Sequence, residues 1–147
     1  MSKSGTAYKK TDGLYLHSSS QTTDGVWIAS HPFRKLEANS TAAAMGEAVI
    51  QVIEASTSPV EHPTSWGDLF TPMLELAGAK SWRAFKKDAK CCGLEMEGEQ
   101  LRITPQRSLG PNQGFEPILQ ETVEIPFAAS PDQIGAALER AFLTCES

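Results

Sequence analysis

Two segments of the chain repeat apolar residues at the three- and four-residue spacing of one helix face, and this pattern most constrains the fold. The segments cover residues 41–55 and 130–142. Thr41 is placed to cap the first helix, and Ser130-Pro131-Asp132-Gln133 has the capping residue, first-turn proline and N3 glutamine of a helix start. Each helix must bury its apolar face against another layer. The apolar positions are Met45, Ala48, Val49, Val52 and Ile53 in the first segment and Ile134, Ala137, Leu138, Ala141 and Phe142 in the second.

The two helical segments align with each other at an offset of 89 residues, which places Gly46 opposite Gly135. A glycine inside a helix costs stability, but it allows a neighbouring element to approach closely. Shared amphipathic spacing explains much of the alignment, and one pair of similar helices does not make a repeat protein.

Three short strand-like segments precede the first helix. Asp-Gly pairs at residues 12–13 and 24–25 separate them, and this dipeptide is typical of tight turns. We expect residues 1–6 to be frayed and Ser18–Thr23 to form a polar connection. The pattern predicts an antiparallel meander whose strands are Ala7–Lys10, Leu14–Ser18 and Val26–Ala29.

A second group of strands is predicted after Lys90, where the apolar period becomes two residues. Cys92, Leu94 and Met96 share one face of a strand and alternate with glycine or glutamate. A turn at Gly98–Gln100 makes this segment the first arm of a hairpin. The hairpin's second arm is Leu101–Thr104, residues 106–117 are expected to be a long loop, and Leu119–Pro126 is expected to be a further strand.

The middle of the chain predicts two shorter helices. One begins at Ser65-Trp66-Gly67-Asp68, is divided by Pro72 and stops at Gly78, and the other begins at Ser81. Strands and helices together indicate an α+β fold in which helices pack on a mostly antiparallel sheet. The length of 147 residues fits a single domain over 1–147.

Charge excludes some classes of function. The net charge of −5 disfavours nucleic-acid binding, and no run is apolar enough for a membrane span or a signal peptide. We therefore expect a cytoplasmic protein with neither nucleic acid nor membrane as its partner. Residues 37–75 and 93–147 are strongly acidic, whereas residues 76–92 are basic. The acidic blocks are suited to a basic protein partner, although charged residues also simply line solvated faces.

The cysteines and histidines predict no metal or cofactor site. An odd cysteine count, with Cys91 and Cys92 adjacent and Cys145 distant, fits a reducing cytosol better than a disulfide framework. Adjacent cysteines in a strand point to opposite faces, which is unsuited to zinc. One alternative stays open, namely a small enzyme in which Cys91 or Cys92 is activated by His17 or His31.

Glu95, Glu97 and Glu99 form the candidate partner-binding surface. They recur at strand spacing along one face of the predicted hairpin, where they suit a basic protein, a divalent cation or only solvent. Asp68 and Trp66 belong to the other acidic block and are candidates to join this surface, because aromatic residues often anchor interfaces. Trp66 is equally suited to packing beneath its own helix.

The order of several motifs carries a family resemblance. Ser81-Trp82-Arg83-Ala84-Phe85 leads into the acidic hairpin, whose second arm is Leu101-Arg102-Ile103-Thr104-Pro105; Gly114-Phe115-Glu116 and the helix beginning Ile134-Gly135 follow. This order resembles the immunity proteins of bacterial contact-dependent growth inhibition systems. The resemblance covers roughly residues 78–145, with added support from the Met45–Val49 segment.

The resemblance implies a cytosolic protein without catalytic turnover. Such a protein binds the C-terminal toxin domain of a delivered effector in a one-to-one complex, and it neutralises that toxin, usually a nuclease, by occluding its active site. The contacts with the toxin vary within the family, so no individual residue is carried over. An adaptor or chaperone for a secreted effector would have the same sequence features.

Overall fold

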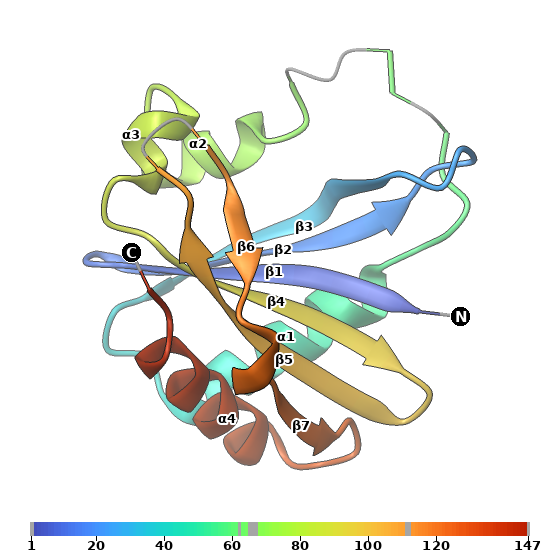
Figure 1. Cartoon of the computed structure of the whole chain (residues 1–147), viewed down its shortest axis with the longest axis vertical. Coiled ribbons are helices and arrows are strands. Elements are labelled where there is room, and N and C mark those ends of the chain that lie inside the picture. The colour runs from blue at the N-terminus through green and yellow to red at the C-terminus, as the bar shows by residue number, and fades with distance from the viewer. Residues whose placement is uncertain (1, 62, 65–67, 111–112, 147) are drawn as a thin grey trace.

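The computed structural model describes residues 2–61, 63–64, 68–110 and 113–146, which form four α-helices and one seven-stranded antiparallel sheet (Figure 1). The predicted α+β class is confirmed. The strands are β1 (Lys3–Lys10), β2 (Gly13–Gln21), β3 (Trp27–Glu37), β4 (Lys90–Glu97), β5 (Gln100–Ser108), β6 (Phe115–Pro117) and β7 (Val123–Pro126). The helices are α1 (Ala42–Ala55), α2 (Thr71–Ala77), α3 (Trp82–Lys86) and α4 (Pro131–Leu143). The strand order is β3-β2-β1-β4-β5-β6, and β7 also pairs with β5.

The N-terminal meander is confirmed, but its strands are longer than the sequence pattern predicts. β1 begins at Lys3, so residues 3–6 lie in a strand rather than in a frayed end. The predicted polar connection at Ser18–Thr23 is wrong, since β2 continues to Gln21. Its three serines are buried, and hydrogen bonds satisfy some of the polar groups along the strand: Ser20 Oγ lies 2.8 Å from Ser30 Oγ, and Ser56 Oγ donates to the Ser19 carbonyl. The buried Ser18 Oγ has no hydrogen-bond partner among the described residues.

α1 and α4 pack side by side on one face of the sheet, which we call the inner face (Figure 1). Both predicted caps are present: Thr41 Oγ1 accepts from the Ala44 N–H, and Ser130 and Gln133 form a capping box. The apolar face of each helix meets the strand residues whose side chains alternate inward. The core on this face includes Val49, Ile53, Leu138, Leu94, Leu101 and Ile103.

The opposite, outer face carries a second, smaller core beneath α2 and α3. Tyr8 and Tyr15 point outward from β1 and β2 and meet Phe85 of α3, whose ring lies 5.2 Å and 5.6 Å from theirs, centroid to centroid. Phe70 and Met73 complete this aromatic layer. α2 and α3 cover one end of the outer face, and the other end of that face carries an open groove.

The short helices confirm one boundary and correct another. Gly78 ends α2 in the left-handed conformation, with φ of 66°, as the sequence predicts. The predicted start at Ser65 lies outside the described residues, and the helix instead begins at Thr71. Pro72 therefore sits in the first turn, where its missing N–H has no partner to lose, and it does not divide the helix.

The predicted strand Leu119–Pro126 is also corrected. Residues Leu119–Glu121 form a 3₁₀ turn, and only Val123–Pro126 pairs with β5. The Thr122 hydroxyl donates to the Leu119 carbonyl at 2.8 Å, which stabilises the turn against an extended strand. The expected loop at residues 106–117 is shorter than predicted, because β5 continues to Ser108 and pairs with β6.

Candidate partner-binding surface

The open part of the outer face forms a shallow polar groove of about 490 Å³ between β1, β4, β5 and the segment before β7. The alternation of β4 explains its lining, because Cys92 and Leu94 belong to the inner core while Glu95 and Glu97 are exposed on the other side. Thr6, Glu95, Arg102, Thr104, Gln106, Thr122 and Glu124 line this groove, together with smaller or apolar residues.

Arg102 of β5 is the centre of the charges in this groove. It lies directly opposite Glu95 on β4 and Glu124 on β7. Its guanidinium nitrogens lie 4.0 Å from Glu95, 3.6 Å from Glu97 and 3.4 Å from Glu124, measured to the carboxylate oxygens. All four side chains are about half exposed, so these ion pairs add little to the stability of the fold. Three carboxylates around one guanidinium leave the cluster negative, which suits a cationic partner.

The structure brings together only part of the surface that the sequence suggests. Glu95 and Glu97 share the outer face and one arginine, whereas Glu99 lies in the turn after β4 and is exposed. Asp68 precedes α2, which packs on β3, and the two strands β2 and β1 separate β3 from β4. Asp68 therefore does not join the hairpin glutamates, and Trp66 lies outside the described residues.

Sequence reasoning missed Arg102 and Glu124 as parts of this surface. The signal was present, because both residues alternate with core positions of their strands, Leu101 and Ile103 in β5 and Val123 and Ile125 in β7. Recognising it required the pairing of β5 with both β4 and β7. That pairing is a long-range property that strand periodicity alone does not specify.

A catalytic site made of Cys91 and His17 finds no support in the geometry. Burial lowers the pKa of His17 to about 4, and its Nδ1 donates to the Ser18 carbonyl at 2.7 Å. Burial also raises the pKa of Cys91, whose thiol donates to Gln106 Oε1. A nucleophilic cysteine needs a stabilised thiolate. Moreover, β1 lies between the strands that carry His17 and Cys91.

Two further properties concern metals and membranes. Among the residues that the structure describes, no group of three or more His, Cys, Asp or Glu side chains is arranged to hold a metal ion. Within the same residues, no helix combines the length and the apolar character needed to cross a bilayer.

Comparison with known proteins decides the family. The model of a family described as CDI immunity protein matches residues 6–145. The chain belongs to the CDI immunity protein family. The resemblance seen in the order of the sequence motifs is thus confirmed, and it extends across the N-terminal meander as well. No curated protein sequence matches this CDI immunity protein family member.

Two solved structures share the fold of this CDI immunity protein family member. A protein of unknown function from Neisseria meningitidis has a TM-score of 0.82 at 19% identity, with 99% of this chain and 96% of that chain covered. The CdiA-CT/CdiI toxin and immunity complex from Yersinia pseudotuberculosis contains a chain with a TM-score of 0.77 at 18% identity, and the coverage is 99% and 98%. At these identities the likeness establishes a common fold.

Proposed function

We propose that this chain, acting as one domain over residues 1–147, binds and neutralises the C-terminal toxin domain of a contact-dependent growth inhibition effector. The observation that carries the proposal is the family match over residues 6–145. The similar structure from Yersinia pseudotuberculosis supports it, because that protein is described as part of a toxin and immunity complex. The protein acts in the cytoplasm by stoichiometric binding, one immunity protein to one toxin, and has no turnover of its own.

The toxin domain in this proposal is a basic nuclease. Nucleases bind a polyanion and commonly present a cationic active-site surface, to which an acidic protein surface is complementary. The cluster of Glu95, Glu97 and Glu124 around Arg102 is such a surface, and Glu99 extends it into the hairpin turn. A protein seated over the cationic site would exclude the nucleic acid, which is inhibition by occlusion.

The ion pairs of Arg102 with the glutamates can be replaced by ion pairs with the toxin. A lysine or arginine of the toxin can replace Arg102 at Glu95 or Glu124, because the existing pairs are long and half exposed. Negative charge near the groove accelerates the encounter, whereas buried contacts made afterwards set the residence time.

Co-expression tests the proposal. The proposal expects a large exported protein to be encoded next to this chain, and the C-terminal fragment of that protein is induced with and without this chain. We expect growth arrest without the protein, rescue with it, and a one-to-one complex on co-purification. Arrest that persists in the presence of this protein would contradict the immunity function. An adaptor or chaperone would form the complex and leave the cells unprotected.

A further inference from the structure

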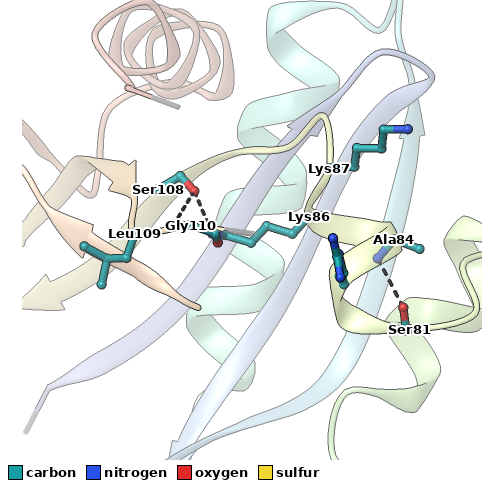
Figure 2. Close-up of a pocket in the computed structure, with 8 residues that line it drawn as sticks. Ser81, Ala84, Lys86, Lys87, Ser108, Leu109 and Gly110 are labelled. Carbon is teal, nitrogen blue, oxygen red and sulfur yellow. Dashed lines mark hydrogen bonds between the residues drawn. The ribbon is translucent and has the colours of Figure 1, made fainter. Parts of the chain in front are cut away.

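A second pocket lies between α3 and the segment that follows β5, and it is lined by cations (Figure 2). It measures about 830 Å³, which is within the range of ligand-binding pockets. Arg83, Lys86 and Lys87 line it from α3 and the residue after it, and none of the described residues that line it is acidic. The other lining residues are Ser81, Ala84, Ser108, Leu109 and Gly110.

Lys86 is the most unusual residue of this pocket, because it is 5% exposed and its contacts among the described residues are with neutral groups. Its Nζ donates to Ser108 Oγ at 2.6 Å and to the Gly110 carbonyl (Figure 2). The same Nζ lies 4.7 Å from the centroid of the Phe115 ring. Among the described residues no carboxylate pairs with it. A buried charge is normally paired, so this lysine favours an anion supplied from outside.

The helix around Lys86 concentrates positive charge rather than dispersing it. Arg83 is three residues before Lys86 and four before Lys87, and at these spacings like charges are neighbours that repel. Asp88 is the only acidic residue between residues 76 and 92. Its carboxylate is already bound by Lys10 and by the backbone and hydroxyl of Thr11, so it does not neutralise the pocket.

Two groups in the pocket define the chemistry of its occupant. Ser108 Oγ accepts from Lys86 and from the Gly110 N–H, so its own hydrogen stays available to an anion's oxygen. Leu109 is 44% exposed beside these polar groups. An apolar side chain among cations is typical of an interface with a protein, where apolar contacts accompany charged ones. The surrounding net charge of −5 opposes a polyanion such as RNA.

We propose that this cationic pocket binds an acidic segment of the partner protein, with Asp or Glu carboxylates seated against Arg83, Lys86 and Lys87. The inference rests on the proposed function, because the partner is the toxin domain. The interface then has two poles of opposite charge. A partner with acidic residues at one end and basic residues at the other is fixed in one orientation, and partners lacking this arrangement are rejected.

The positions of the two charged sites allow a single partner to reach both. α3 lies on the outer face of the sheet, and Glu95 and Glu97 project from the same face. β4 begins after α3 at Lys90 and reaches Glu97 at its far end, so the sites are separated by roughly 23 Å, the length of an eight-residue strand. This distance is less than the diameter of a small protein domain.

Affinity measurements on the complex test the pocket. The double variant Arg83→Glu, Lys87→Glu reverses two exposed charges in the pocket, and Lys80→Glu, Lys90→Glu makes the same change of net charge outside it. We expect the pocket variant to raise Kd at least about ten-fold and the control to raise it less than about three-fold. An equal rise in Kd for both variants would show that only long-range attraction is involved. An unchanged Kd in the pocket variant would show that the pocket does not contact the partner. Either result overturns the proposal.

A peptide-binding measurement on the protein without toxin tests the pocket independently of the proposed immunity function. The amide NMR signals of Ser108 and Gly110 are followed during titration with a hexaglutamate peptide and, in parallel, with inorganic phosphate. We expect the peptide to shift both signals in the wild-type chain and to leave them in place in Arg83→Glu, Lys87→Glu. If no toxin complex forms, the immunity function fails while this measurement still decides the pocket. If only phosphate shifts the two signals, or if neither probe shifts them, the assignment of an acidic segment is overturned.

Discussion

Gly46 of α1 and Gly135 of α4 form a reciprocal close contact between the two long helices. A Cβ built on Gly46 would lie 1.9 Å from the carbonyl oxygen of Pro131, and a Cβ on Gly135 would lie 1.8 Å from the carbonyl oxygen of Ala42. Each glycine thus faces the backbone at the N-terminal end of the other helix. The close approach expected at Gly46 is confirmed, and Gly135 provides its counterpart.

Replacing either glycine by alanine should destabilise the fold. Alanine gains about 1 kcal/mol of helix propensity, but the added methyl group forces the two backbones apart, and we expect a net loss of about 2 kcal/mol or more. The double variant should lose less than the sum of the single losses, because one displacement of the helices relieves both overlaps. Urea unfolding measures these changes.

Gly114→Ala provides the control, because a Cβ at Gly114 has no atom of the described residues within 4 Å. We expect the urea midpoint of this variant to stay close to that of the wild type. A wild-type midpoint for Gly46→Ala or Gly135→Ala would disprove the close contact.

His17 should make the stability of the protein depend on pH. Burial lowers its pKa to about 4, whereas an unfolded histidine titrates near 6.5. The unfolded chain therefore binds the proton first as pH falls, so the stabilisation is complete above pH 6.5 and is lost between pH 6.5 and 4. From pH 7.5 to 5 the loss amounts to about 2 kcal/mol.

Two measurements check this prediction. The imidazole signals of His17 in NMR should titrate near pH 4, and a pKa near 6.5 would refute the assignment. Denaturation of His17→Asn at pH 7.5 and 5 should show a smaller difference than the wild type, since the variant has lost this titrating group while the acidic residues stay the same.

Cys145 should be the reactive thiol of the protein. A hydrogen bond with Cys92, whose sulfur lies 3.7 Å away, lowers the pKa of Cys145 to about 7, while burial raises the pKa of Cys91. Cys145 is also the only one of the three that is not fully buried. Alkylation of the native protein at pH 7.5, followed by peptide mass spectrometry, should label Cys145 first and the other two only after unfolding.

Cys92→Ala removes the hydrogen bond that favours the Cys145 thiolate. The pH at which alkylation of Cys145 reaches half its maximal rate should therefore rise toward that of a free thiol, near 8.5. An unchanged midpoint would assign the lowered pKa to another cause. Rapid labelling of Cys91 in the native protein would revive the Cys/His enzyme hypothesis.

Charge reversal of Glu95, Glu97 and Glu99 to lysine should slow association with the toxin about ten-fold at low salt and flatten its salt dependence. The cause is loss of the attraction that guides a cationic partner to the groove. Stopped-flow mixing at several salt concentrations measures the rate. An association rate equal to that of the wild type would exclude this surface as the site of first encounter, without deciding the function.

Arg102→Gln is the control within the same cluster, because it makes the cluster more negative instead of more positive. Among the described residues, it removes the one positive charge that pairs with Glu95, Glu97 and Glu124. Association should become faster than in the wild type. A slower rate would mean that Arg102 itself contacts the partner.

Local sequence patterns predicted α1, α4 and both strand groups because their determinants lie within a few residues of one another. The caps at Thr41 and Ser130 and the alternation of Cys92, Leu94 and Met96 are of this kind. Predictions failed where a distant contact decided the outcome. Ser20 is buried in β2 because Ser30, on the neighbouring strand β3, accepts or donates its hydrogen bond.

The sequence by itself thus determined the two long helices, the alternation of β4 and the family, since each depends on residue order alone. Only the tertiary structure decided which charges meet. It gathered Glu95 and Glu124 around Arg102, excluded Asp68 from that surface, and left Lys86 buried without a carboxylate among the described residues. The physical reason is that ion pairing depends on strand register and helix packing, which join residues far apart in the chain.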